Sequence, residues 1–367
     1  MAYLTGMLLL DAPASALNNA GAEPGAKTDN TIAVKKIRAA DGVYPYVSAQ
    51  AFRFWLRTTL EHSDLGWKAA PVFREKKIAF SESDPITNWD DDLFGYMRAQ
   101  SKKGDEEEKA KNKEKTQAAM PLEKDCEVTR VSPFRVSTFV SVSPAQIVSD
   151  FGTMARQDGN PVPHEHEFYR AHLRGLLSLD LTSAGTFYDA ERVGYKNLDS
   201  YRRDKAVEEG CDICDGDKKI RKQKAYRLPL GKRTERVSAL VKGLASLGGG
   251  AKQTLHYTDL MPAAVVMAVT KGGNHPFYRM FAGTKSGRTE LHEAAVREIF
   301  ASFQDDLQSP VYVGWAQGFL DEERSKFEAL KAELKTPFGI AEIAHPRTVL
   351  LQLAEELAKH EHADWYA

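Results

Sequence analysis

Cysteine is scarce in this sequence, and so are long apolar segments and any excess of one charge. Three cysteines among 367 residues are too few for a disulfide framework, which favours a reducing compartment, so we expect a cytoplasmic protein. No stretch approaches the run of about 18 apolar residues that a spanning helix needs, which gives a membrane role no support. With 50 Lys and Arg against 51 Asp and Glu, an argument for a nucleic-acid partner must rest on where the charges lie.

Catalytic signatures are also absent from the sequence. It contains no nucleophile elbow, no HExxH helix, no Walker loop and no dinucleotide fingerprint. We therefore expect a non-catalytic protein. The alternative is a metal-dependent nuclease that processes RNA or cleaves a target, in which Asp90, Asp91 and Asp92 hold a divalent ion. Three adjacent aspartates are more often solvated charge.

Hydrophobic periodicity predicts a mixed α+β fold. The apolar run Tyr3–Leu10 is typical of a buried strand, and Ser48–Leu60 has the apolar spacing of a helix that Ser48 caps. The later segments complete the order strand, helix, strand, strand, helix, strand of a ferredoxin-like or RRM-like βαββαβ unit. They are Phe134–Ser143, Glu167–Leu181, Arg236–Leu247 and Met261–Thr270.

Polar insertions separate the parts of this unit, and an acidic segment follows it. From Thr289 onward the chain carries 15 acidic and 7 basic residues, a net charge of −8, which suits a packed lobe or a subunit-contact surface. The insertions lack apolar periodicity. We expect a central domain of residues 1–61, 131–187 and 233–285, insertions at 62–130 and 188–232, and a mostly helical C-terminal extension at 286–367.

The segment 18–57 holds most of the candidate RNA-binding side chains. Small residues around its asparagines and lysines would let backbone amides approach a phosphate, and the start of the predicted helix favours an anion. Two arginines follow at i and i+4 on one helix face. The alternative is a solvated loop and a surface helix. The candidates are Asn18, Asn19, Lys27, Lys35, Lys36, Ser48, Gln50, Arg53 and Arg57.

Two further segments carry weaker signals of the same kind. Glycines after the second predicted helix would let the chain pass close to a polyanion, although three glycines there usually make a cap and a turn. Residues 218–236 include nine basic residues and an aromatic that could stack on a base, or they form a solvated loop. The candidates are Gly248, Gly249, Gly250, Lys252, Lys222 and Tyr226.

A pair of cysteines has the spacing of metal ligands. Cys211 and Cys214 are separated by two residues, and Cys126 with His164 or His166 could complete a tetrahedral zinc site. The sequence lacks a second close cysteine pair. We expect no cofactor, and zinc held by Cys211 and Cys214 is the alternative.

Several strings resemble the DevR family of CRISPR-associated autoregulators. The most specific lie near the N-terminus: Leu17–Gly21, Val34–Ile37 and Tyr44–Arg57. The similarity continues through Phe168–Leu181, Gly185–Phe187 and Leu244–Lys252. Together these strings cover roughly half of the chain.

The resemblance implies a non-catalytic backbone subunit of type I-B Cascade surveillance complexes. Such a subunit has an RRM-like palm, and here residues 62–130 would be finger-like and residues 188–232 thumb-like. Several copies would assemble as a filament along one CRISPR RNA and grip its sugar-phosphate backbone, which leaves the bases free to pair with target DNA. The implied partners are CRISPR RNA, further copies of the chain, other Cascade subunits and, through the guide, target DNA.

Overall fold

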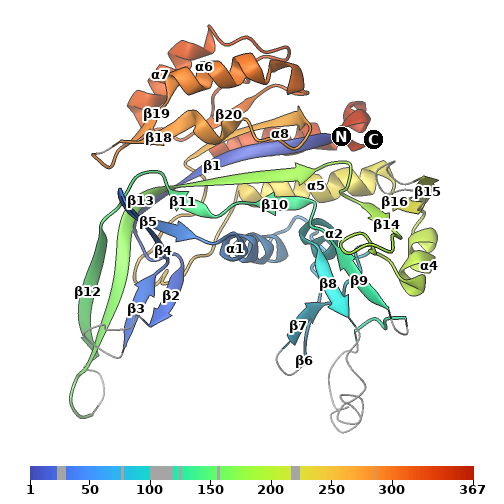
Figure 1. The fold of residues 1–367 in the computed structure, drawn as a ribbon, viewed down its shortest axis with the longest axis horizontal. Helices are drawn as coiled ribbons and strands as arrows, with labels where there is room; N and C mark the ends of the chain where they lie inside the picture. Colours follow the sequence, from blue (N-terminus) through green and yellow to red (C-terminus); the bar gives the residue numbers. More distant parts are fainter. Residues whose placement is uncertain are drawn as a thin grey trace.

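The computed structural model describes residues 1–22, 30–75, 78–99, 119–123, 126–154, 158–215, 224–284 and 286–367. Its centre is a large, mostly antiparallel sheet (Figure 1). In the order of hydrogen-bonded neighbours, the strands are β20 (Tyr312–Trp315), β17 (Ala264–Lys271), β1 (Ala2–Ser15), β13 (Val162–Asp180), β11 (Phe139–Ser141), β5 (Gly42–Val47) and β4 (Lys36–Ala39).

The central elements follow one another as the sequence predicts. After β1 come α1 (Ala49–Glu61), β10 (Phe134–Val136) with β11, then β13, α5 (Leu230–Leu244) and β17. β1 pairs antiparallel with β13 on one side and with β17 on the other, and β10 and β11 both pair with β13. The α+β fold with a βαββαβ core is therefore confirmed.

The structure differs from the prediction most clearly in three places. The strand expected at 134–143 is divided into β10 and β11. Helix α5 begins at Leu230 instead of Arg236, because its first turn is charged and gives no apolar period. The connection before α1, expected to be a loop, contains β4, β5 and two more strands that are too short for alternation to show. These two are β2 (Asn19–Ala22) and β3 (Thr31–Val34).

Both faces of the sheet are covered, which explains the unbroken apolar run in β1. Leu8 and Leu10 contribute to a core with α1, α5 and α8 (Pro346–Ala358). Met7 and Leu9 point to the opposite face and contribute to a second core with α6 (Glu293–Ser302) and α7 (Asp321–Lys331). Figure 1 shows α6 and α7 stacked on the sheet as a separate layer.

The C-terminal region packs against the sheet, which agrees with the expectation of a packed lobe. Strand β20 belongs to this region and extends the sheet beside β17. No helix among the described residues is long and apolar enough to cross a membrane. The remaining elements are the strand pair β18 (Phe281–Gly283) and β19 (Thr289–Leu291), and the 3-10 helices η2 (Phe277–Met280), η3 (Gln304–Asp306) and η4 (His360–Tyr366).

Two arms extend past α1 on the same side of the sheet (Figure 1). In the first arm, β12 (Ile147–Met154) pairs with the first half of β13, and β3 also pairs with that half. The sequence reading placed this whole hairpin inside the central domain. The second arm consists of β6 (Val72–Glu75), β7 (Ile78–Ser81), α2 (Trp89–Phe94), β8 (Tyr96–Ala99) and β9 (Glu127–Arg130).

The described part of the second insertion packs against the second arm. Arg202 is fully buried and donates hydrogen bonds to the carbonyl oxygens of Glu82 and Ser83 in that arm. Lys205 forms an ion pair with Asp84 at 2.5 Å. The insertion contributes α4 (Ser200–Glu208), β15 (Asp212–Asp215) and β16 (Lys224–Arg227), and β16 pairs with β14 (Thr186–Tyr188), which begins just before the insertion.

Candidate nucleic-acid interface

The N-terminus of α1 is held by residues that the sequence singled out. Ser48 caps the helix, as predicted, and its Oγ accepts a hydrogen bond from the Ala51 amide at 3.3 Å. The Ser48 amide donates to Asn18 Oδ1 at 3.0 Å, and the Lys35 amide donates to the Asn18 carbonyl at 2.8 Å. Asn18 therefore positions the start of α1 beside β2 and β3.

The glycine loop, residues 248–252, lies directly against α1. The Gly248 amide donates to Thr59 Oγ1 at 3.0 Å, and the Ala251 amide donates to the Leu17 carbonyl at 3.0 Å. Gly249 has φ +136°, and a Cβ there would lie 2.6 Å from the Trp55 ring. Segments 18–57 and 248–252 are thus brought together, although about 200 residues separate them.

Two of the predicted phosphate-binding cations are used inside the chain. Lys36 forms a largely buried ion pair with Glu167. Arg53 donates to the Phe134 carbonyl at 2.8 Å and to the Phe94 carbonyl, and burial, together with nearby Arg57, lowers its pKa to about 10. These contacts correct the reading of Lys36 and Arg53 as surface cations.

The other candidates near α1 keep more exposure. Lys35, Arg57 and Lys252 are half-buried, as is Asn19, and Gln50 is exposed at the start of α1. Lys252 has φ +55°, a left-handed conformation that costs energy for a residue with a side chain. Lys27 and Lys222 lie outside the described residues.

Several residues in the described part of the basic run at 218–236 have structural roles. Tyr226 is 7% exposed and packs in a small core with Phe187 and Cys211, which corrects the expectation that it stacks on a base. Arg233 is buried and donates to four carbonyl oxygens, among them those of Ala184 and Tyr366. These carbonyls belong to segments distant in sequence from Arg233, so no local pattern indicates its burial.

The three aspartates of α2 are neither solvated nor gathered around one point. Asp90 accepts from the Trp67 indole, and Asp91 accepts from Ser81 and from the Asp84 amide. Burial raises the pKa of Asp91 to about 6. Asp92 forms ion pairs with Arg130 and Arg236. Both sequence interpretations are corrected, because each carboxylate already has its own partners, and the nuclease alternative loses its proposed ligand set.

The two cysteines of the CxxC pair lie along an extended segment. Cys211 directly precedes β15, and Cys214 lies within it. An extended chain rises about 3.3 Å per residue, so their Cα atoms are about 10 Å apart and their side chains point to opposite faces. Two sulfurs on one zinc ion lie within about 4 Å of each other. This arrangement does not place both cysteines on one ion, and burial raises the pKa of the Cys211 thiol to about 11.

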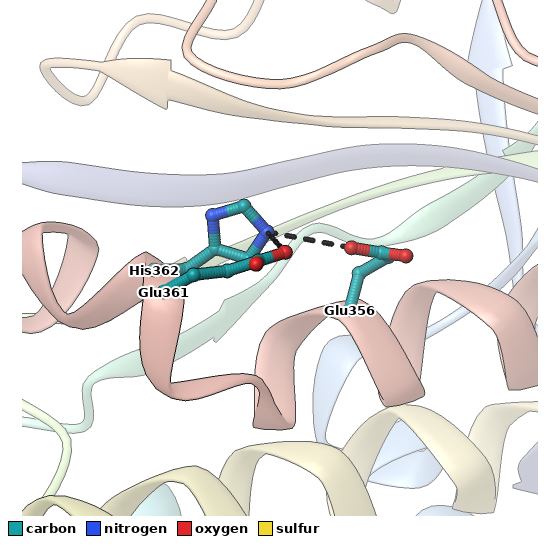
Figure 2. Close-up of side chains that lie close together, drawn as sticks. All are labelled: Glu356, Glu361 and His362. Atoms are coloured by element: carbon teal, nitrogen blue, oxygen red, sulfur yellow. Dashed lines mark hydrogen bonds and ion pairs between the residues drawn. The ribbon is translucent and has the colours of Figure 1, made fainter.

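One group of potential metal ligands occurs within the described ranges. Glu356, Glu361 and His362 approach one another where α8 meets η4 (Figure 2). Lys359 Nζ lies 2.6 Å from a Glu356 oxygen and 4.0 Å from a Glu361 oxygen, and the His362 ring stacks on Trp365 at 3.8 Å. The Lys359 ammonium therefore already pairs with these carboxylates, and the group connects η4 to α8.

Aromatic rings that the sequence reading missed connect the glycine loop to the first arm. His256, four residues after Lys252, stacks on Phe168 of β13 with ring centroids 4.9 Å apart. It also meets His166 edge to face at 5.0 Å. Burial, then His256, lowers the pKa of His166. No local pattern indicates this contact, because β13 and the loop are distant in sequence.

Comparisons with known proteins give a fold but no family. No protein-family model matches the chain, and no curated protein does. A chain of a solved structure described as "CRISPR RNA-guided surveillance complex, pre-nicking" is 11% identical with a TM-score of 0.53, over 97% of this chain and 100% of that one. A chain of a "CRISPR RNA-guided surveillance complex" is 11% identical with a TM-score of 0.49, over 96% and 99%. The first likeness shows a shared fold across nearly the whole length of both chains.

Proposed function

We propose that this chain is a non-catalytic RNA-binding subunit of a CRISPR RNA-guided surveillance complex. The observation that carries the proposal is that the glycine loop contacts α1 at Trp55 and Thr59 and also contacts Leu17, next to the Asn18 that holds the N-terminus of α1. This meeting lies between two arms on one side of the sheet. The fold shared with a chain of such a complex over 97% of this sequence supports it.

The proposed contacts are with the sugar-phosphate backbone of the RNA. Lys35 and Lys252 would neutralise phosphates, while Ser48, Gln50 and the amides of the glycine loop would donate or accept hydrogen bonds at sugar and phosphate oxygens. A subunit that holds any guide must leave base edges open for pairing with a target. These groups suit that task because contacts with phosphate and sugar oxygens are the same for every base.

The assembly follows from the same proposal. Several copies would line one guide RNA in the cytoplasm, together with other subunits, and would meet target DNA through the guide. Within such complexes, the sequence resemblance favours the DevR subunit of type I-B. The second arm, which lies within residues 62–130, would form its fingers, and we retain residues 188–232 as the proposed thumb.

RNA binding by the assembled protein tests the proposal. We expect affinity to fall steeply with salt and to be the same for guides of unrelated sequence. The double variant Lys35→Ala, Lys252→Ala should weaken binding equally for every guide and reduce the salt slope by about 2. As a matched control, Lys271→Ala, Arg279→Ala removes two exposed cations, one at the end of β17 and one in η2, and should change little. Undetectable or salt-independent binding would overturn the proposal.

A further inference from the structure

Helix α1 presents different residues on each of its sides, because successive residues turn by about 100° around the axis. Its inward side consists of Phe52, Leu56 and Leu60, which are fully buried in the core under the sheet. The Phe52 ring stacks on Phe139 of β11 with centroids 4.3 Å apart. This packing fixes which side of α1 faces away from the sheet.

Both flanks of α1 are also occupied. On one flank, the guanidinium groups of Arg53 and Arg57 lie over the Phe94 ring of the second arm, 5.1 and 4.4 Å from its centroid. On the other flank, Trp55 and Thr59 contact the glycine loop. These contacts hold α1 between the second arm and the glycine loop.

The outward side of α1 carries Gln50, Phe54 and Thr58. Phe54 is at its centre, about 160° around the helix from the buried Phe52 and Leu56, and 64% of its surface is exposed. A lone exposed phenylalanine is ordinary on a protein surface. Phe54 differs because it lies between the second arm and the glycine loop, which carries the proposed phosphate ligand Lys252, and one helical turn from Arg57.

The charge around Phe54 suits an anionic partner. Half-buried Arg57 lies on one side of it, and the first turn of α1 contains no acidic residue. The acidic residue of α1, Glu61, is the last residue of the helix. An exposed aromatic ring beside arginines is the combination on which single-stranded RNA bases stack.

We propose that Phe54 is a stacking platform for one nucleobase of the bound RNA, with the adjoining phosphates directed toward Arg57 and the glycine loop. This inference rests on the proposed RNA binding and adds a base contact to it. Every base has an aromatic face, so stacking on Phe54 holds a nucleotide without selecting its identity. The Watson–Crick edge of that base stays open.

The test replaces Phe54 and follows both affinity and base stacking. Phe54→Ala should weaken binding of single-stranded RNA about tenfold, equally for purine and pyrimidine sequences. Phe54→Trp should keep the affinity. An RNA that carries the fluorescent base 2-aminopurine should be quenched on binding by the wild type and by Phe54→Trp, and not by Phe54→Ala. The matched control is Phe338→Ala, which removes a ring that is 51% exposed in the C-terminal region.

The outcomes separate this inference from the proposed function. If RNA binding is salt-dependent and falls in the Lys35→Ala, Lys252→Ala variant but is unchanged in Phe54→Ala, the stacking contact is refuted and the proposed function stands. If Phe54→Ala impairs assembly of copies without changing RNA affinity, Phe54 is a protein contact and the inference is wrong. Absence of RNA binding in every variant and in the wild type overturns both.

Discussion

Asp92 connects four parts of the chain through one buried carboxylate. Its oxygens accept hydrogen bonds from Arg130 in β9, Arg236 in α5 and the Gly185 amide before β14, at 2.5 to 3.1 Å. Asp92, Arg130 and Arg236 are each at most 6% exposed. The carboxylate is therefore the common counter-charge of two guanidinium groups that join the second arm to the central sheet.

Replacing Asp92 tests this role. Asp92→Asn leaves two buried arginines without their shared counter-charge, so we expect a loss of about 3–5 kcal/mol in the free energy of unfolding. Denaturant unfolding measures it, with Asp204→Asn on the exposed side of α4 as the control. A loss below about 1 kcal/mol, which is typical of exposed ion pairs, would contradict the assignment.

The sequence predicted individual residues well where local chemistry decides their role. Ser48 caps α1 because a hydroxyl before a helix satisfies a free amide, and this was evident from the sequence. Arg53, Arg233 and Asp92 were assigned to the surface or to metal binding, since charge is usually solvated. Their partners are carbonyls and guanidinium groups from distant segments, which no local pattern reveals.

At the scale of elements, two neighbouring glycines of the glycine loop differ in whether their place beside α1 leaves room for a side chain. Gly249 has a positive φ and no room for a side chain beside Trp55, whereas a Cβ on Gly248 would meet nothing within 4 Å. The two neighbouring glycines thus give a matched pair of positions. One requires glycine and the other does not.

We expect Gly249→Ala to be destabilising and Gly248→Ala to be nearly neutral. Alanine at 249 must adopt an unfavourable φ and displace Trp55, at a cost of about 1–3 kcal/mol. Because the displaced loop moves away from α1, RNA affinity should fall as well. Thermal unfolding and RNA titration of both variants measure these effects, and equal behaviour of the two alanines would show that the loop does not depend on its contact with α1.

The order of the central elements was predictable, and the arms were not. Helix α1 has a clear apolar period, and the central strands are rich in β-branched and leucine residues. In the first arm, β12 is mostly exposed. Its sequence therefore shows no alternation of buried and exposed residues. The convergence of α1 with the glycine loop depends on the sheet order, which periodicity does not determine.

At the scale of the whole molecule, a near-zero net charge conceals two opposite halves. Residues before Thr289 include 43 basic and 36 acidic residues, a net charge of +7, and those from Thr289 onward carry −8. Helices α6 and α7, which belong to the acidic part, lie on the face of the sheet opposite α1. The proposed RNA-binding side is thus separated from much of the negative charge by the thickness of the sheet.

Reversing charge on the acidic layer should therefore leave RNA affinity almost unchanged. Glu298→Lys and Asp305→Lys change two exposed residues, in α6 and η3. The field of such exposed charges is screened over about 8 Å at physiological salt. We expect less than a twofold change in the same RNA titration at 0.15 M salt. A large increase in affinity would mean that the overall field of the molecule, rather than the α1 side, governs binding.

The position of β1 in the sheet also has a consequence for synthesis of the chain. β1 is made before both of its partner strands, which are Val162–Asp180 and Ala264–Lys271. The apolar residues of β1 that belong to both cores therefore lack their partner strands until the chain has been synthesised as far as β17. Such distant pairing slows folding and leaves the strand edges of the nascent chain exposed to aggregation until β17 is made.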